Sequence, residues 1–369
     1  MRREKAKRER KAPNHKKRIL IATGILFSLP LLLLAAFSVY RMAGKAGLEN
    51  HAVTMRDIGR ANITRFPVLQ QSGGEGDLPE LEEGQIAYHG KVYEYNEDLL
   101  VFLCLGIDSR QDIKKEKVPG EGGQADTVIL AVIDQKAKTL KVINISRDTM
   151  TKVGFYDTNG LYLYDKEAQL ALQYAYGDGR EKSCELMEQA VSNLFYGIPI
   201  HGYAAIDIKA VSQLNDAVGG VEVTVIEDLS RFTPDLALGN TLTLTGRQAL
   251  HYVQERQVET EELGANNLRI ERQKQYLMAF FAKVKEGTKK DIMLPVELFN
   301  TASRHMITSI TADQAAYLST IVLECVFGED DMVSVQGEVE KEDVYEEFHV
   351  DEQALYDLIV NVFYREADK

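Results

Sequence analysis

Residues 122–150 read GGQADTVILAVIDQKAKTLKVINISRDTM, and this stretch decides the fold. Two runs rich in apolar and β-branched residues flank a polar segment at 135–138, a pattern that predicts an antiparallel hairpin. If the chain turns there, the numbers of paired positions add up to 273, as 135 and 138 do. Position 126 then lies opposite position 147. We therefore expect Asp126 and Arg147 to meet at one edge of a sheet.

A third strand is expected at residues 99–108, within the segment LLVFLCLGIDSR. Its continuous apolar run ends at Asp108, as is typical of a strand buried on both faces. If this strand runs parallel to the second hairpin strand, Asp108 reaches the same edge as Asp126 and Arg147. Two carboxylates suit Mg²⁺, and an arginine binds phosphate. The alternative is a surface ion pair between Asp126 and Arg147 without a catalytic role.

A second group of polar residues lies in the helical segment 266–285, which contains RIERQ at 269–273. The spacing i, i+3 and i+4 places Arg269, Arg272 and Gln273 on one face of the helix. Apolar residues fall on another face, which can pack inward: Ile270, Leu277, Phe281 and Val284. The arginine face is interpreted either as a phosphate site or as an ordinary solvated surface.

The remaining segments predict helices alternating with strands. We expect two helices within 163–200, broken at 177–179, a strand at 201–207, a helix at 209–218 and a strand at 221–225. Further elements are a hairpin at 85–96, a helix at 243–257 and an edge strand at 344–351. This alternation predicts an α/β fold, a layered α-β-α domain with a central mixed sheet. Tyr174 and Tyr176 are candidates for lining a lipid or sugar cleft, and burial beneath the sheet is the favoured alternative.

The N-terminus predicts a membrane anchor. Residues 1–18 hold ten Lys or Arg and two Glu, and residues 19–40 are 22 apolar or neutral residues without a charge. A helix of that length crosses the hydrocarbon core of roughly 30 Å. We expect one transmembrane helix at 19–40, with the basic tail in the cytoplasm and the main domain extracytoplasmic at the cell membrane. A signal peptide is the alternative, but its apolar region is usually shorter.

Composition narrows the class of partner. The net charge of −13 and the +8 of the tail leave about 21 negative charges on the rest of the chain, which argues against nucleic acid. The three cysteines have no paired spacing, so neither a disulfide framework nor a zinc site is expected. Residues 41–83 end in a Gly-rich and acidic stretch and are interpreted as a stalk. The domain is assigned to 84–369, with a core at 96–285 and a C-terminal extension at 286–369.

Eight segments, taken in order, resemble the LytR-CpsA-Psr family of cell-wall glycopolymer transferases. They span about residues 96–285 and read LGIDSR, ADTVILAVID, ISRDT, YAYGDG, YGIPIHGYAAID, AVGGVEV, LTGRQALHYV and RIERQ. No single motif is decisive, but the ordered set is specific. The resemblance implies a membrane-anchored, Mg²⁺-dependent phosphotransferase. Such an enzyme moves a phospho-glycopolymer from a polyprenyl-pyrophosphate carrier to a peptidoglycan hydroxyl, with the prenyl tail in an apolar tunnel.

The resemblance also implies roles for individual residues. Asp108 and Asp126 match the family's Mg²⁺-coordinating carboxylates, either of which is a candidate base, and Arg147 matches its essential arginine. The positions that match pyrophosphate-binding residues are Arg147, Arg256, Arg269, Arg272, Gln273, Gln124 and Gln254.

This sequence departs from the family pattern at the pyrophosphate site. The family commonly has arginine where Gln124 and Gln254 stand, and an acidic residue where Asn266 and Asn267 stand. A glutamine still donates hydrogen bonds but does not offset pyrophosphate charge. The alternative function is therefore a non-catalytic protein that binds lipid-linked glycan or scaffolds cell-wall assembly.

Overall fold

The computed structural model describes residues 42–51, 81, 84–107, 117–255, 265–291, 293–341 and 346–367, with side chains of the 265–291 segment from 268 onward. The predicted basic tail, the predicted transmembrane segment and most of the predicted stalk lie outside these residues, as do Asp108 and Arg256. Among the helices that are described, none combines the length and apolar character needed to cross a bilayer.

The strands are β1 Gln85–Tyr88, β2 Lys91–Tyr95, β3 Leu99–Ile107, β4 Ala125–Asp134, β5 Thr139–Ile145, β6 Met150–Tyr156, β7 Tyr162–Gln169, β8 Tyr203–Asp207, β9 Val221–Thr224, β10 Thr241–Leu244, β11 Met306–Thr308, β12 Met332–Ser334, β13 Gly337–Lys341, β14 Glu346–Val350 and β15 Tyr364–Glu366. The helices are α2 Leu172–Ala175, α3 Glu181–Leu194, α4 Ala210–Ala217, α5 Gly246–Gln254, α6 Ala265–Lys290, α7 Leu294–Ala302, α8 Ala312–Val322 and α9 Glu352–Phe363. Residues 42–51 form a further helix.

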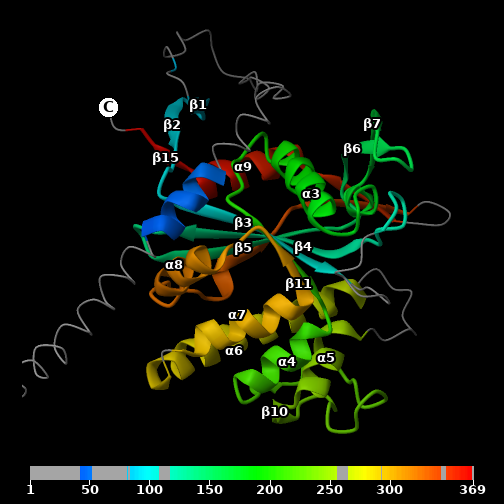
Figure 1. The fold of residues 1–369 in the computed structure, drawn as a ribbon, viewed down its shortest axis with the longest axis vertical. Helices are drawn as coiled ribbons and strands as arrows, with labels where there is room; N and C mark the ends of the chain where they lie inside the picture. The colour runs from blue at the N-terminus through cyan, green and yellow to red at the C-terminus, as the bar shows by residue number, and fades with distance from the viewer. Residues whose placement is uncertain are drawn as a thin grey trace, which may run out of the picture.

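Six of these strands form a central mixed sheet in the order β11-β8-β3-β4-β5-β12 (Figure 1). Strand β3 pairs antiparallel with β4 and parallel with β8, and β4 pairs antiparallel with β5. The β4–β5 register joins Val128 to Ile145 and Asp134 to Thr139, so paired numbers add up to 273 as predicted. Strand β3 therefore runs in the direction of β5, with β4 between them, as the third-strand prediction required.

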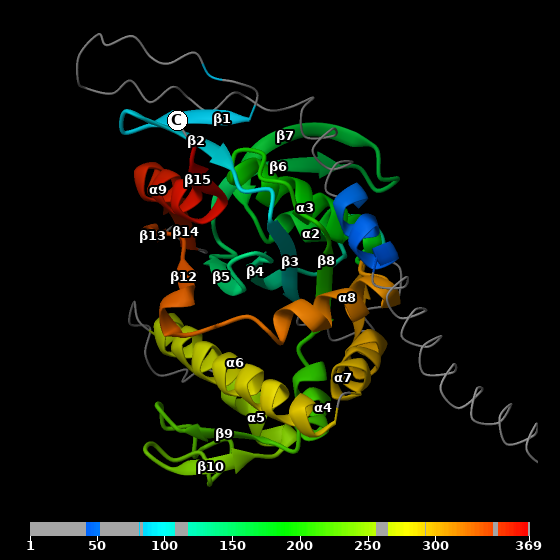
Figure 2. The same ribbon diagram turned by 90° about the vertical axis from the view of Figure 1, so that its left-hand side faces the viewer.

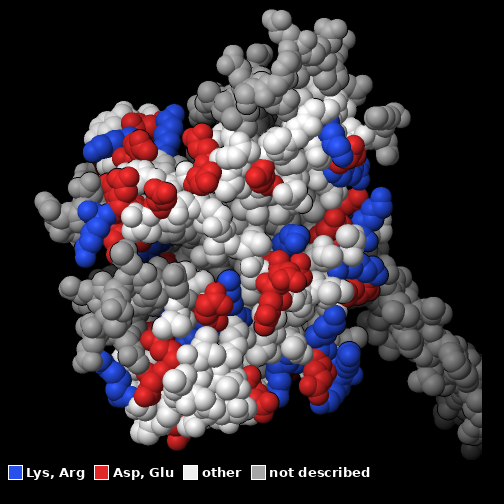
Figure 3. Space-filling model, turned by 180° about the vertical axis from the view of Figure 1, so that it is seen from behind, with Lys and Arg blue, Asp and Glu red and all other residues white. Residues whose placement is uncertain are grey.

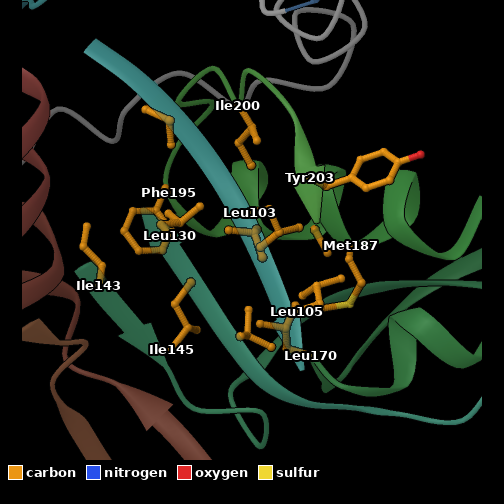
Figure 4. Close-up of a cluster of buried hydrophobic side chains, with 14 of the residues drawn as sticks. Leu103, Leu105, Leu130, Ile143, Ile145, Leu170, Met187, Phe195, Ile200 and Tyr203 are labelled. Carbon is orange, nitrogen blue, oxygen red and sulfur yellow. The ribbon is translucent and has the colours of Figure 1, made fainter. Parts of the chain in front are cut away.

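Helices cover both faces of this sheet. Odd-numbered residues of β3, including Val101, Leu103 and Leu105, are fully or almost fully buried against α3 and α9 (Figure 4). Even-numbered residues, Leu100 and Phe102, pack toward α8 and the helix at 42–51. This alternation follows from the two-residue repeat of a strand, and it explains why β3 has a continuous apolar run. The predicted α-β-α layering with a central mixed sheet is confirmed.

A second core lies below the sheet in Figure 1, where β9, β10, α4, α5, α6 and α7 pack together. Helix α5 begins with a capping box, in which the Thr245 side chain accepts from the Gln248 backbone and the Gln248 side chain accepts from the Thr245 backbone. Helix α6 is buried on two sides, because Leu277 and Phe281 join the sheet core while Tyr276 and Phe280 join the second core. The apolar face predicted for α6 is therefore divided between the two cores, because Val284 packs with Tyr276 and Phe280 in the second core and not with Leu277 and Phe281.

The two ends of the domain meet in a small sheet of order β1-β2-β15. The β1–β2 hairpin turns at His89 and Gly90, both with positive φ, as the sequence predicted. The C-terminal region is part of the main core, because β11 and β12 form the two edges of the central sheet and α9 covers one face (Figure 2). Elements β11, β12 and α9, from the region predicted as a C-terminal extension, therefore belong to the main core.

Two segments differ from the sequence-based expectation. The first helix expected from residue 163 onward is wrong over most of its length, because Tyr162–Gln169 form β7, which pairs with β6. Alternating aromatic and aliphatic residues at 161–164 favour a strand, and β6 supplies the backbone hydrogen bonds that this strand needs. The second segment is 42–51, assigned to the stalk, which packs as a helix with Leu48 only 1% exposed. Its His51 Nε2 lies 3.4 Å from Glu188 Oε1 on α3.

Candidate functional site

Asp126 and Arg147 lie side by side where β4 begins and β5 ends. This margin of the central sheet, formed by strand ends and distinct from the outer strands β11 and β12, is the edge meant below. Asp126 is the second residue of β4, and Arg147 follows the end of β5 by two positions. Arg147 Nη1 donates to Asp126 Oδ1, so the predicted ion pair is present. Both side chains are about one-third exposed, at 31% and 32%. The pair is therefore held by the sheet and remains open to a ligand from solvent.

Asp148 is a second acidic neighbour of Arg147 and was missed as a site residue from the sequence. Its Oδ1 lies 3.6 Å from Arg147 Nε and accepts a hydrogen bond from Gln169 Nε2 at 3.2 Å. Asp148 was visible in the motif ISRDT, but nothing in the local pattern separated it from an ordinary turn residue. Arg147 thus lies between two carboxylates, which fix the direction of its guanidinium.

The backbone around Arg147 is tightly held. Thr149 is fully buried, and its backbone N–H and hydroxyl both donate to Ser146 O, at 3.1 and 2.7 Å. The carbonyl of Arg147 accepts from Ala171 N at 2.9 Å, directly before α2. Because these contacts close a compact turn at the end of β5, the position of Arg147 is set by backbone hydrogen bonds more than by its own ion pairs.

The end of β3 reaches the same edge. Ile107, the last residue of β3, pairs with Ala125 after a bulge between Gly106 and Ile107. Since Ala125 directly precedes Asp126, β3 ends next to Asp126. Gly106 permits this close approach, because a Cβ there would lie 2.9 Å from Thr127 Cβ. Asp108 itself is outside the described residues, and its predicted convergence with Asp126 stays a prediction. Gln124, just before β4, is exposed.

Of the two carboxylates predicted to bind Mg²⁺, the structure describes that of Asp126. Among the described residues no group of three His, Cys, Asp or Glu side chains is arranged to hold a metal ion. Mg²⁺ does not require such a cage, since it commonly takes one or two carboxylates and completes its shell with water and phosphate oxygens. Asp126, with Oδ1 directed at Arg147, is suited to supply one ligand through its other oxygen.

The second predicted group, on α6, is largely internal. Arg272 is fully buried; its Nε lies 2.9 Å from Glu227 Oε2, and its terminal nitrogens donate to the carbonyls of Tyr252 and Glu255. Burial lowers the pKa of Arg272, and the neighbouring carboxylate of Glu227 acts in the opposite direction. The interpretation of this helix face as an ordinary solvated surface is therefore wrong.

The neighbours of Arg272 on α6 hold the same part of the chain. Gln273 Nε2 donates to Val253 O at 3.0 Å, so two side chains of α6 bind carbonyls in the last turn of α5. Arg269 and Gln254 are half-buried in the same region. Arg256 follows this turn, two residues after α5 ends, and lies outside the described residues. The α6 side chains thus fix the point from which the segment with Arg256 departs.

The strand edge and the α5–α6 region are connected through β8 and α4. Asp207 pairs with Ile107, and Ile208 N donates to Ile107 O at 3.3 Å, immediately before α4. Helix α4 packs closely against α5, where a Cβ on Gly246 would lie 2.3 Å from Ser212 O. The strand ends beside Asp126 are therefore joined, through β8 and α4, to the helices α5 and α6 around Arg272.

The charged surface is mixed in sign. On the face shown in Figure 3, acidic and basic side chains are interspersed without a continuous basic area among the described residues. Nucleic-acid binding normally requires such an area.

Solved structures share this fold. The crystal structure of Bacillus subtilis TagV is 22% identical, covers 72% of this chain and 96% of its own, and superposes with a TM-score of 0.54. The structure of protein gbs0355 from Streptococcus agalactiae is also 22% identical and has a TM-score of 0.57, covering 72% of this chain and 86% of its own. TagT bound to LI-WTA, at 21% identity, has a TM-score of 0.53 and covers 72% and 90%.

Sequence relatives carry enzyme names. A protein from Enterococcus faecalis named polyisoprenyl-teichoic acid–peptidoglycan teichoic acid transferase TagU is 28% identical over 260 residues, which are 70% of this chain and 77% of that protein. The corresponding transferase TagV of Bacillus subtilis is 25% identical over 225 residues, or 59% and 53% of the two chains. The LytR-CpsA-Psr family model matches residues 79–361, including the β11–α9 region. Since that match covers well over half of the sequence, this protein belongs to the LytR-CpsA-Psr family.

Proposed function

We propose that this protein is a glycopolymer phosphotransferase, which moves a phospho-glycopolymer from a polyprenyl-pyrophosphate carrier to a peptidoglycan hydroxyl. The observation that carries the proposal is the Asp126–Arg147 pair, fixed at the sheet edge and one-third exposed. Family membership and the names of the relatives support the same reaction class. A guanidinium held beside carboxylates at an open edge is suited to bind a diphosphate and stabilise charge during phosphoryl transfer.

In the proposed reaction, the acceptor hydroxyl oxygen forms a bond to the glycan-side phosphorus of the diphosphate. The bond from that phosphorus to the bridging oxygen breaks, polyprenyl phosphate leaves, and the hydroxyl proton passes to a carboxylate. Asp126 is a candidate for that base, as is Asp108. Arg147 binds the phosphate oxygens, and Asp126 and Asp148 orient its guanidinium. In-line geometry and charge stabilisation account for most catalysis in this reaction class.

Mg²⁺ is the proposed cofactor, with Asp126 and Asp108 as its protein ligands. When bound, the ion would offset the negative charge of the diphosphate. The proposed diphosphate-binding residues beyond Arg147 are Arg256 and Arg269, with Gln124 and Gln254 as neutral donors. For Arg272 and Gln273, whose polar atoms hold the end of α5, we propose a positioning role toward the segment that carries Arg256.

The proposed location is the outer face of the cell membrane, with residues 19–40 as a single transmembrane anchor. The support is the length and composition of that segment and the basic tail before it. An anchored domain would remain close to the lipid-linked donor. The apolar tunnel for the prenyl tail is proposed from the family resemblance alone, because the buried side chains between the sheet and α3 (Figure 4) give it no support.

The test is turnover by the full-length protein in detergent micelles. The donor is a polyprenyl-diphosphate-linked disaccharide, the acceptor is a peptidoglycan oligomer, and released polyprenyl phosphate is measured with and without Mg²⁺. We expect Arg147→Ala and Asp126→Asn each to lower turnover by more than about a hundredfold, the scale of losing a charged contact made in the transition state. The matched control is Lys136→Gln, in the β4–β5 turn at the other end of the hairpin. Unchanged turnover in either site variant would remove that residue from the reaction.

A second candidate is a non-catalytic protein that binds lipid-linked glycan. The observation that favours it is the pair of neutral residues, Gln124 and Gln254, where the family commonly has arginine. Wild-type protein that binds the donor but releases no polyprenyl phosphate at any Mg²⁺ concentration would select this function.

A further inference from the structure

Two surface features lie outside the candidate site. One is an open hollow of about 340 Å³ beside Tyr176, whereas Tyr174, the other tyrosine considered for a cleft, is fully buried and donates to Gly179 O at 3.0 Å. The other is β13, the outer strand of the β13–β14 hairpin (Figure 2). All residues of β13 are exposed, and among the described strands it pairs only with β14. One edge of β13 is therefore open for pairing with another chain.

The register of the hairpin shows which backbone groups of β13 point outward. Val339 lies opposite Phe348, and Asp351 N donates to Gln336 O at 3.0 Å. Hydrogen-bonded and non-hydrogen-bonded pairs alternate along an antiparallel ladder. Positions 338 and 340 therefore bond β14, while positions 337, 339 and 341 direct their N–H and C=O groups away from it. Within the part of the chain that is described, these outward groups have no hydrogen-bond partner.

The opposite edge of the hairpin is attached to the candidate site. Phe348 N donates to Asp148 O at 3.0 Å, and Thr149 forms a parallel bridge with Phe348. Glu346 O accepts from Gln169 Nε2 at 2.8 Å. Strand β13 thus lies two strand spacings, roughly 10 Å, from the chain that follows β5. A strand added to β13 would lie one spacing farther away and would leave the candidate site accessible.

The side chains along this edge are acidic. Glu338 and Glu340 of β13 lie on one face of the hairpin, and their cross-strand partners, His349 and Glu347, lie on the same face. His349 Nε2 lies 3.2 Å from Glu347 Oε2 and 3.9 Å from Glu340 Oε2. Glu338 has no ion-pair partner among the described residues. One imidazole therefore faces three carboxylates, and this face stays negative whether or not the imidazole is protonated.

The other face of the edge is apolar at its centre, where Val339 is 47% exposed. An edge strand that is protected against pairing often carries a proline, a bulge or an inward-pointing charge. Strand β13 has no proline, and its ladder with β14 has no register shift. Its one lysine, Lys341, is the last residue of the strand and lies on the face of Val339. The edge is therefore regular along its length.

The charge of the edge selects among possible partners. In a second copy of this chain, β13 would bring its own glutamates to the same face, and like charges directly opposite each other are destabilising. An extended segment with cationic side chains at alternate positions has the complementary charge, because alternate residues of a strand point to one face.

We propose that β13 binds an extended segment of a partner protein that carries lysine or arginine at alternate positions. The segment adds to the β13–β14 hairpin as a third strand. Hydrogen bonds to the outward backbone groups around Val339 supply affinity, and cationic side chains over Glu338 and Glu340 supply selectivity. Because the other edge of the hairpin is bonded to Asp148, the partner is held beside the candidate site.

The first test uses wild-type full-length protein in micelles. It is titrated with a short end-blocked peptide of alternating lysine and valine, and the dissociation constant is measured by calorimetry. In a strand that pairs through one edge, the N–H groups of alternate residues face the neighbouring strand. Two further peptides are therefore N-methylated, one at each lysine and the other at each valine. We expect one of them to bind more than about tenfold more weakly and the other to bind as the parent does.

Variants of the edge test the same contact from the side of the protein. Val339→Pro removes an outward N–H, and a solvent-facing strand edge tolerates proline, so thermal unfolding should stay unchanged while peptide binding weakens more than about tenfold. Val339→Thr should bind normally. The double change Glu338→Gln and Glu340→Gln should weaken binding by about 3- to 10-fold, the range of two exposed charge contacts. The matched control changes two exposed strand glutamates elsewhere, Glu167→Gln and Glu222→Gln, and leaves binding unchanged.

The inference is overturned if the lysine–valine peptide does not bind, if a glutamate–valine peptide binds equally well, or if both N-methylated peptides behave alike. Folded Val339→Pro that binds normally also overturns it. If that variant unfolds, the methylated peptides still decide, because they are tested on the wild type. Self-association that Val339→Pro abolishes would assign the edge to a second copy, and displacement of the peptide by a soluble peptidoglycan oligomer would assign it to the acceptor. Either result overturns the inference.

Peptide binding is independent of the proposed reaction. Arg147→Ala should lose turnover and bind the peptide as the wild type does. Peptide binding by a protein without any turnover would refute the proposed function and leave the partner site standing.

Discussion

Replacing Arg272 by alanine should destabilise the fold before it affects chemistry. The side chain is fully buried and joins three partners, the Glu227 carboxylate and the carbonyls of Tyr252 and Glu255. Alanine leaves Glu227, only 10% exposed, as a buried carboxylate without its cation, and leaves two carbonyls without a donor. Breaking a buried ion pair from one side costs about 3–5 kcal/mol. For a domain of this size, that loss lowers Tm by roughly 6–20 °C.

The assay is thermal unfolding followed by circular dichroism, together with a double-mutant cycle. Arg272→Met combined with Glu227→Gln should cost clearly less than the sum of the two single changes, because neither charge is then left alone. The same proteins are compared in the turnover assay at a temperature where all remain folded. A variant Arg272→Ala that keeps its Tm within about 2 °C and loses turnover would refute the positioning role, and would make Arg272 a direct ligand of the diphosphate.

Three further predictions concern other parts of the domain. Asp148→Asn should lower turnover by less than about fivefold, because the contact of Asp148 with Arg147 is long and partly exposed. A loss as large as that of Asp126→Asn would show that Asp148 is as important to turnover as Asp126. Gly246→Val should destabilise the domain by about 1–3 kcal/mol in urea unfolding, because α4 leaves no room for a side chain, and a neutral result would mean that the α4–α5 contact is loose. The hydrogen bond to Glu188 raises the pKa of His51, and burial raises the pKa of Glu188. A group whose pKa is raised on folding stabilises the folded state at low pH. Both shifts therefore stabilise the packing of helix 42–51 at low pH, and this contribution is lost as the pH rises through the raised pKa values. Hydrogen-exchange protection of that helix should therefore fall as the pH rises above the ordinary pKa of histidine, and this dependence should weaken in Glu188→Gln.

The sequence predicted those features that depend on local periodicity. The register of β4 and β5 followed from the position of one polar turn, and with it the contact of Asp126 with Arg147. The hairpin at His89–Gly90 and the helices α5 and α6 were likewise visible in their own residues.

What the sequence did not predict depends on distant contacts. The spacing of Arg272 on α6 showed which face it lies on, but not that Glu227 and the end of α5 cover that face. Residues 165–169 contain good helix formers, and pairing with β6 extends the strand that begins at Tyr162 through them. The role of Asp148 depends on Gln169, a residue of that same strand. These misses share one cause, since tertiary partners override local propensity wherever they supply the missing hydrogen bonds.

The position of β12 and β15 bears on how the chain is made. Lys141, on β5, pairs with Asp331 across 190 positions, and Arg365 pairs with Glu94 across 271. Until the last forty or so residues have been synthesised, β5 has an open edge and α9 is missing from one face of the sheet, which is an arrangement prone to wrong pairing between nascent chains. Such long-range closure is also slow. Premature termination near residue 330 would therefore yield an aggregating product and not a shortened, folded domain.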